Sequence, residues 1–548
     1  MQGLIALVGL AATITLASPA AAQTTRPSPA DDFSTAAPAQ PLPEPAETAL
    51  ATIKAPALGA HIALLASPAL EGRGLTSHGL DAAAEYVAAS LTLAGIPPLP
   101  SADKESYFQP FAMREIRDLS GRITVESRPG NAVRSRDFLS GVDCLLPTLP
   151  PQVIAAPAVF AGFGLREPAL GHDDLKGMDV RGKVVLILDG VPSGSQWQTP
   201  ELVDRYGSLK VRERVAAKLQ SLRPLAPAAV LVVADSDLLL RALREDPPES
   251  YQFRSVDTVP DADDEPIWAL VSPALAEALL APAGPRSGST ATTAPRDLPG
   301  TTATIRVSGN ERLAWSRNVV GFLAGSDPTL RDEAVVIGAH MDHLGRVGDV
   351  IYPGADDNAS GVASLLEIAK AFAACEPKPK RTVIFAFWAG EEEGKLGSGH
   401  WVRHPSWPLV KTTAYLNLDM VGHPWSTEEI RALVADTKLP NGEAFVTGLR
   451  SADFIEPGVA EWSPDLAAAL QRAGHATGLA LHLDRTDGKH GGSDYRDFAR
   501  AGIPWVRFFG NFFPGYHEPT DTSDKLDPEQ VRRMARLCFA TAWLVANR

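Results

Sequence analysis

Apolar and polar positions follow two different periods along this chain, and the change of period divides it into segments. Helical spacing begins near residue 50: the segments 60–74 and 79–96 show it, and the second ends at Gly95 as a helix C-terminus does. Short apolar runs typical of buried strands occupy 184–188 and 229–233. The sequence therefore predicts helices at the start of the folded part and a β-rich segment in its middle.

From Asn318 onward, strand-like apolar runs alternate with helical patterns. The runs are AVVIGAH (334–340), RTVIFAFWAG (381–390), TAYLNLDM (413–420) and IPWVRFFG (503–510), with helical patterns at 359–375 and 528–547. This alternation predicts an α/β fold with a mostly parallel mixed sheet and helices on both faces. Ligands of such sheets bind at the C-terminal ends of the strands, so polar residues at those ends are the candidates for chemistry.

The first 50 residues differ from the rest of the chain. Residues 1–22 contain an apolar run followed by Ala20-Ala21-Ala22, the pattern of a signal peptide and its cleavage site. An uncleaved anchor is the alternative, but the run is shorter than the ~20 residues that span a bilayer. Residues 23–50 are rich in Pro and Ala and predict a disordered linker. We expect an exported protein, periplasmic or extracellular, without a stable membrane anchor.

Linker composition also appears at 281–304, where it predicts the end of an inserted domain. The expected organisation is a main domain in two parts, 51–148 and 305–548, interrupted by an insert at 149–304. A length of 548 residues is consistent with more than one compact unit.

Charge and cysteine content exclude some classes of partner and site. The chain has 51 basic and 65 acidic residues, a formal charge of −14, which argues against nucleic acid as a partner because that binding depends on Lys and Arg contacts to phosphate. Three cysteines leave at least one unpaired and give no zinc-finger spacing. Nothing in the sequence indicates an oligomeric state.

Acidic and histidine side chains follow the predicted strands. Each of these residues alone is typical of a turn, a helix cap or the protein surface, but together they bring Asp, Glu and His to one edge of a sheet. Two His with several carboxylates and no thiolate suit zinc or a similar divalent ion, and the surplus of carboxylates suggests two ions. The candidates are His340, Asp342, Asp356, Asp357, Glu391, Glu392, Asp419 and His517.

These segments make the chain resemble metallopeptidase family 28, the co-catalytic di-zinc exopeptidases that include aminopeptidases and glutamate carboxypeptidase II. The resemblance covers most of 50–548 and follows the family's order. It rests on LASPALEGRG, SRNVVGFLAGSDP, VVIGAHMDHLG, PGADDNASGVA, FAFWAGEEEGKLGS, LNLDMVG, GSDYRDFARAGIP and YHEPTDTSDKL.

The resemblance implies a secreted enzyme with two Zn²⁺ per chain that acts on peptides with a free N-terminus. It makes Glu391 the general base of a metal-activated water. It makes Asp356 the carboxylate between the ions, with His340 and Asp419 on one ion, Glu392 and His517 on the other, Asp342 orienting His340, and Asp357 forming a cis peptide with Asp356.

Two further expectations come from the resemblance. Some relatives have a tyrosine three residues before the SD pair that helps to polarise the substrate carbonyl, and this chain has His490 there, either as a donor or as a loop histidine. The insert is similar to a protease-associated (PA) domain, which would form a β-rich lid or only a spacer.

Other functions remain open from the sequence. A carboxypeptidase or dipeptidase would use the same metals with arginines near the substrate carboxylate. A non-catalytic binding protein of this fold would lack metal ligands, and here all five implied ligands and Glu391 are present. A phosphoesterase with a similar metal pair is disfavoured by the resemblance.

Overall fold

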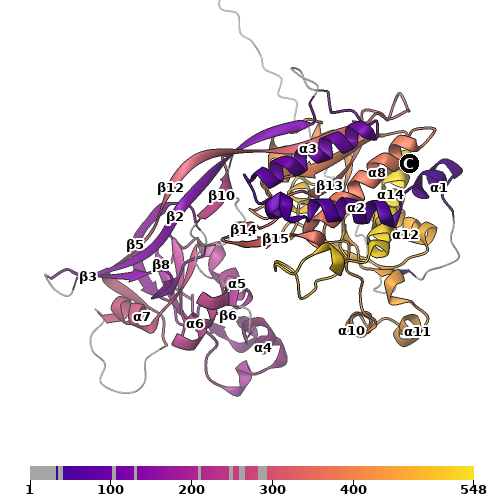
Figure 1. Ribbon diagram of the computed structural model, residues 1–548. Helices are drawn as coiled ribbons and strands as arrows, with labels where there is room; N and C mark the ends of the chain where they lie inside the picture. The colour runs from indigo at the N-terminus through magenta and orange to yellow at the C-terminus, as the bar shows by residue number, and fades with distance from the viewer. Residues whose placement is uncertain are drawn as a thin grey trace, which may run out of the picture.

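The computed structural model describes residues 32–34, 41–100, 106–128, 132–147, 149–207, 211–245, 251–257, 266–281 and 293–548. The predicted signal peptide therefore lies outside the described residues. The chain forms a larger and a smaller body (Figure 1), which two long strands connect, β2 (Phe108–Ser127) and β12 (Arg296–Leu323). These strands pair antiparallel along most of their length and run from one body into the other.

The larger body is built on a mixed sheet whose central strands are parallel. Their order is β22-β17-β13-β16, followed by β12, which pairs antiparallel with β16. The bounds are β13 Ala334–His340, β16 Thr382–Trp388, β17 Thr412–Leu418 and β22 Trp505–Phe508, with β19 (Gly458–Ala460) and β21 (Asp484–Thr486) beyond β22. All four predicted strands are present, and the mixed α/β fold is confirmed.

Helices cover both faces of this sheet because its strands are apolar on both sides. Along β13, Val335 and Ile337 pack on one face and Ala334 and Val336 on the other. The first face contacts α2 (Ala55–Leu65), α3 (His78–Leu93), α8 (Gly361–Ala374), α12 (Pro464–Thr477) and α14 (Pro528–Asn547). The second contacts α9 (Leu396–Arg403) and α13 (Tyr495–Arg500).

Short elements complete the larger body. Helices α10 (Thr427–Asp436) and α11 (Gly442–Thr447) lie below it in Figure 1, beside the small sheet β1-β20-β18 (Phe33–Ser34, Ala480–His482, Phe454–Ile455). The hairpin β14 (Gly345–Val347) and β15 (Val350–Tyr352) follows β13.

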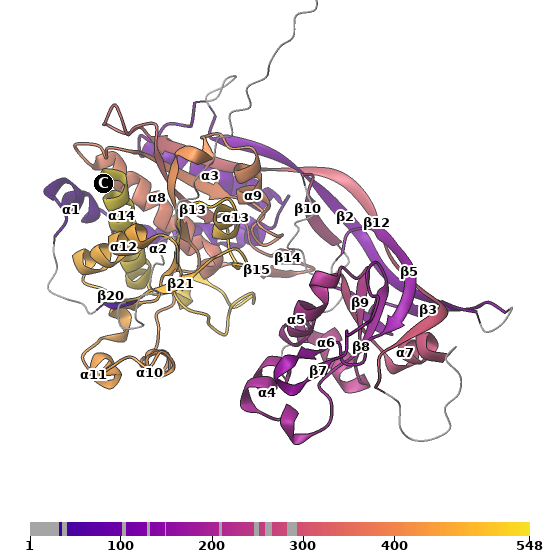
Figure 2. The ribbon, with the colours of Figure 1, turned by 180° about the vertical axis from the view of Figure 1, so that it is seen from behind.

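The smaller body is itself an α/β unit, seen from behind in Figure 2. Its parallel strands are β5 (Gln152–Phe160), β8 (Val184–Leu188), β9 (Ala229–Val233) and β11 (Trp268–Val271), so both strands predicted here are present. Its helices are α4 (Pro200–Gly207), α5 (Val211–Leu222), α6 (Ser236–Glu245) and α7 (Pro273–Leu280), and its shorter strands are β3 (Arg134–Leu139), β4 (Cys144–Leu145), β6 (Arg166–Glu167) and β7 (His172–Asp173). Strand β10 (Tyr251–Ser255) instead pairs with β2, and its Phe253 packs in the core of the larger body.

The structure corrects three predicted boundaries. The predicted linker, 23–50, extends too far along the chain, because α1 (Glu44–Leu50) is a helix with Ala46, Ala49 and Leu50 buried. The boundary at 148/149 is also late, because Ile123 already packs in the core of the smaller body. Residues 296–304, predicted as linker, belong to β12, where Ala303 is buried.

Within the described residues, no single helix is both long and apolar enough to cross a membrane, although α1 and α2, bent by 49° to one another, pass that test as a pair. Leu50 of α1 and Leu58 of α2 are fully buried in the main core, which also contains residues of α8 and α14.

Candidate metal centre

The C-terminal ends of three neighbouring strands meet at one edge of the large sheet. His340 is the last residue of β13, Asp419 directly follows β17, and Glu391 and Glu392 follow β16 by three and four residues. The turn before α8 and the loop after β22 bring Asp357 and His517 to the same place. The fold thus gathers residues that lie up to 177 positions apart (His340 to His517).

One group of side chains at this edge could hold an ion. His340 Nε2 lies 3.4 Å from Asp357 Oδ1 and 3.3 Å from Asp419 Oδ1. One ligand atom from each residue lies within 4.8 Å of the other two. His340 is almost fully buried, so these donors face one another in a site with little water.

A second group adjoins the first and shares Asp357 with it. His517 Nε2 lies 3.1 Å from Asp357 Oδ2 and 3.2 Å from Glu392 Oε2. His343 Nδ1 lies 2.7 Å from the other oxygen of Glu392 and 3.7 Å from Asp357 Oδ2. The two oxygens of one carboxylate therefore face different groups, Oδ1 the first and Oδ2 the second.

The shared carboxylate is that of Asp357, which corrects the expectation for Asp356. Asp356 is fully buried, but its Oδ1 accepts a hydrogen bond from the Gly422 N–H at 2.7 Å and its Oδ2 lies 2.7 Å from His423 Nδ1. The cis peptide is likewise one residue later than expected, between Asp357 and Asn358. Asp356 therefore anchors the turn to the loop after β17, and Asp357 is the residue that faces the histidines.

Two further carboxylates hold the backbone of the site. The Asp342 carboxylate accepts hydrogen bonds from the N–H groups of Glu391 and Glu392, each at 3.2 Å. Contact with His340 comes mainly from the backbone, because His340 Nδ1 lies 3.1 Å from the Asp342 carbonyl oxygen and 3.9 Å from its carboxylate. Asp521 accepts hydrogen bonds from the N–H groups of Asp356 and Asp357 at 2.9 and 3.1 Å. Asp342 thus orients the two glutamates as well as His340.

A buried guanidinium supports the turn from behind. Arg73 has no exposed surface, and its N–H groups donate to the carbonyl oxygens of Met341, Pro353 and Gly354 at 2.8 Å each, and to that of Leu65. Burial lowers the pKa of Arg73 to about 10, a shift that the nearby carboxylates oppose. This residue ties the loop after β13 to the turn that bears Asp357.

Glu391 lies beside both groups without belonging to either. It is buried, and one of its oxygens lies 3.1 Å from Lys395 Nζ. Burial raises the pKa of Glu391 well above its usual value, and the charges of Asp494 and Glu392 act in the same direction. A carboxyl group with a raised pKa is suited to proton transfer.

His490 lies away from these contacts. It is exposed in the loop before Ser493, and among the described residues it makes no hydrogen bond or ion pair with either group. Tyr516 contacts a residue of the second group directly, because its ring stacks on that of His517 with centroids 3.8 Å apart. Burial, followed by the charge of Asp357, raises the pKa of Tyr516. The role expected for His490 stays a prediction.

Several residues of the site are not predicted from the sequence. His343 lies beyond the end of β13, where strand alternation no longer applies. Arg73 lies near the start of the folded part and Asp521 lies four residues after His517, and no local pattern assigns either residue a role. For Arg73 and Asp521 the signal was their place within matched motifs, LASPALEGRG and YHEPTDTSDKL.

The donor set fits divalent ions. Burial, followed by the charge of Glu392, raises the pKa of Asp357 to about 6, so the carboxylates crowd one another unless a cation lies among them. His517 Nε2 is buried and close to two carboxylates but lacks hydrogen-bond geometry to either. Imidazole and carboxylate donors without thiolate are the ligands of zinc in hydrolytic sites.

The fold and site therefore define an α/β protein with adjoining groups of histidines and carboxylates that could hold metal ions. Residues 318–542 match the model of peptidase family M28. A probable zinc metalloprotease of Pyrenophora tritici-repentis is 30% identical over 268 residues, covering 43% of this chain and 59% of that protein. The probable lipoprotein aminopeptidase LpqL of Mycobacterium tuberculosis is 30% identical over 246 residues, covering 41% of this chain and 44% of that protein.

Residues 318–542 are therefore similar to peptidase family M28, and the chain spans about half the length of these two relatives. A solved structure, the aminopeptidase from Aneurinibacillus sp. strain AM-1, superposes over 92% of this chain and 96% of that one with a TM-score of 0.51 and 20% identity. That likeness extends the shared fold to both bodies.

Proposed function

We propose that this protein is a di-zinc exopeptidase, an aminopeptidase that hydrolyses the N-terminal peptide bond of peptides. The observation that carries the proposal is the carboxylate of Asp357, whose two oxygens face two adjoining histidine groups in the M28 region. The names of the relatives, a zinc metalloprotease and an aminopeptidase, support both the metal and the reaction.

Each ion would have its own residues and one shared carboxylate. His340 and Asp419 with Asp357 Oδ1 would hold the first. His517 and Glu392 with Asp357 Oδ2 would hold the second. His343 contacts Glu392 through Oε1, which leaves Oε2 on the side of His517, so His343 would orient that ligand.

Two divalent ions would supply the positive charge that activates a water molecule and polarises the peptide carbonyl. Glu391 accepts the proton of that water and returns it to the leaving amine. Its backbone N–H is held by Asp342 and its carboxylate by Lys395, so the base is fixed in position before substrate arrives. Its raised pKa allows it to keep the proton between the two transfers.

A free α-amine on the substrate would meet an acidic rim. Asp357, Glu392 and Asp419 lie within one cluster, and an ammonium group is attracted to such a concentration of carboxylates. Two bound dications would offset the charge of these three carboxylates, so the choice of an aminopeptidase over a carboxypeptidase rests on the relative named an aminopeptidase.

The proposal is tested with one peptide in three forms: free at both ends, acetylated at the N-terminus, and amidated at the C-terminus. We expect release of the first residue from the free and the amidated forms, loss of that release in excess chelator, and recovery with Zn²⁺. Cleavage of the acetylated form as fast as the free form would refute an aminopeptidase, and full activity in chelator would refute the metal.

Export is part of the proposal and has its own measurement. Removal of residues 1–22 would leave Gln23 as the first residue of the mature chain. N-terminal sequencing of protein from the periplasmic or culture fraction is expected to begin there, whereas an intact Met1 would contradict cleavage.

A further inference from the structure

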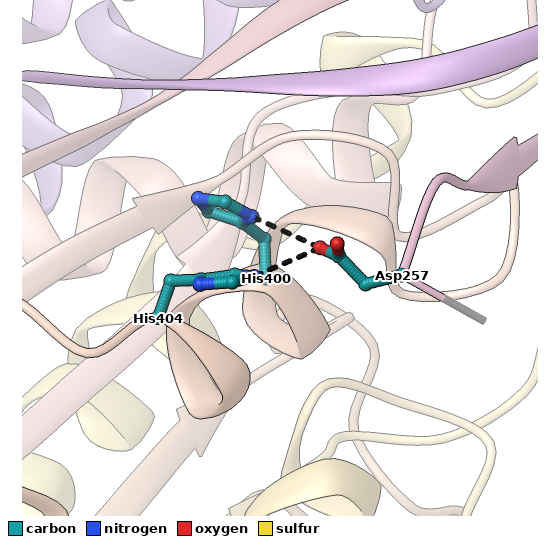
Figure 3. Close-up of side chains that lie close together, drawn as sticks. All are labelled: Asp257, His400 and His404. Carbon is teal, nitrogen blue, oxygen red and sulfur yellow. Dashed lines mark hydrogen bonds and ion pairs between the residues drawn. The ribbon is translucent and has the colours of Figure 1, made fainter. Parts of the chain in front are cut away.

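A third group of metal-ligating side chains lies outside the centre described above and shares no residue with it. His404 Nε2 lies 2.9 Å from Asp257 Oδ2, and His400 Nδ1 lies 3.9 Å from the same oxygen. Figure 3 shows both imidazole rings directed toward this carboxylate. One ligand atom of each residue lies within 4.8 Å of the other two, as in the groups of the main centre.

The group joins two parts of the chain that are distant in sequence. His400 lies on α9 and His404 is the residue at its C-terminal end, so their spacing of four places them on one side of the helix. Asp257 comes two residues after β10, a strand that pairs with the connecting strand β2. Arg403 on α9 donates to the Ser255 hydroxyl at 3.0 Å, so the end of β10 is already held against α9.

A simple hydrogen bond between Asp257 and His404 would not need His400. The ring of His400 is instead held toward the same oxygen by stacking on Phe111, with centroids 5.5 Å apart. Gln109 donates to the His404 carbonyl at 3.2 Å and so fixes the end of the helix. Support of this kind, which fixes ligand rings from outside, is typical of metal sites.

The donor types of this group agree with a metal site. Two nitrogens from a His-x-x-x-His helix and one carboxylate oxygen form a three-ligand set that suits Zn²⁺, with a fourth position for water.

We propose that Asp257, His400 and His404 bind one divalent transition-metal ion, of the Zn²⁺ class, that links β10 to α9. The same strand forms a wall of a cavity of about 430 Å³: Tyr251 and Phe253 line it together with Glu393 and with His343 of the main centre. The ion therefore holds in place a cavity wall that adjoins the main centre. The binding site itself does not depend on the proposed aminopeptidase activity.

The test is the number of zinc ions per chain, measured by inductively coupled plasma mass spectrometry after equilibration with chelator-buffered Zn²⁺. Wild-type protein is expected to hold one more ion per chain than His404→Ala or Asp257→Asn. His78→Ala, a change of an exposed histidine at the start of α3, is the matched control and is expected to bind as wild type does. Equal stoichiometry in wild type and both site variants would overturn the site.

A second measurement tests the link between β10 and α9. In wild type, Zn²⁺ is expected to slow hydrogen exchange in a peptide that covers 251–257 by at least about tenfold, as stabilisation of a local opening by a bound ion does. The effect should vanish in His404→Ala. Exchange in wild type that does not change on adding Zn²⁺ would overturn the structural role.

Discussion

Replacing Asp357 by Asn tests the metal centre at the residue where its two groups meet. The change keeps the size of the side chain and removes one negative charge from a point 3.1 Å from His517 Nε2 and 3.4 Å from His340 Nε2. Asp356→Asn is the matched control, because this neighbour is also a buried aspartate but faces Gly422 and His423. Only Asp357→Asn should weaken the binding of both ions.

The magnitude follows from the charge removed. A unit charge pair 4 Å apart interacts by about 4 kcal/mol at the effective dielectric constant of about 20 that suits protein sites, and a divalent ion doubles that value. The amide oxygen of Asn can still coordinate the ion and restores part of this interaction energy. A net loss of about 4 kcal/mol per ion corresponds to about a thousandfold weaker binding.

The assay is zinc affinity by competition with a chelator of known affinity, together with peptide hydrolysis. We expect Asp357→Asn to bind zinc about a thousandfold more weakly at the main centre and to lose activity, and Asp356→Asn to keep near-normal affinity. The reasoning is refuted if Asp356→Asn loses the ions and Asp357→Asn keeps them.

Two further predictions concern the turn that bears Asp357. Gly354→Ala should lower activity strongly, because its Cβ would lie 2.1 Å from the Asp357 carbonyl oxygen. Gly348→Ala, at the same φ of 60° but with no atom within 4 Å of the new Cβ, should cost only about 1 kcal/mol of stability. Equal losses of activity in the two variants would contradict this reasoning. Arg73→Met should lower stability by about 3–5 kcal/mol, seen as a lower thermal midpoint, because it leaves four carbonyl groups without their donor. Exposed Arg346→Met should change stability by less than about 0.5 kcal/mol, and an equally small effect at Arg73 would count against its role.

The central strands could be predicted because their signal is local. β13 consists of six apolar residues after Glu333 and ends at His340, and its limits agree with the run predicted from the sequence. The domain boundary could not be predicted in the same way. β2 is one continuous strand whose residues Met113 and Ile123 pack in the cores of two different bodies, and only tertiary contacts show where one body ends.

The sequence could not show which of two neighbouring aspartates faces the histidines. Asp356 and Asp357 are chemically identical in sequence, and their roles are set by partners far along the chain. Gly422 binds the side chain of Asp356, and Asp521 binds the backbone of both residues. The contact of His343 with Glu392 likewise joins residues 49 positions apart, which no local spacing reveals.

The most direct test of the central claim is the turnover of a free-amine peptide by zinc-loaded Glu391→Gln, with zinc content measured on the same sample. Glu391 contacts Lys395, and its backbone N–H donates to the Asp342 carboxylate, but it belongs to neither metal group. We predict unchanged zinc content and turnover lower by about 10²–10⁴-fold, the usual contribution of a general base. Turnover equal to that of the wild type would contradict the account.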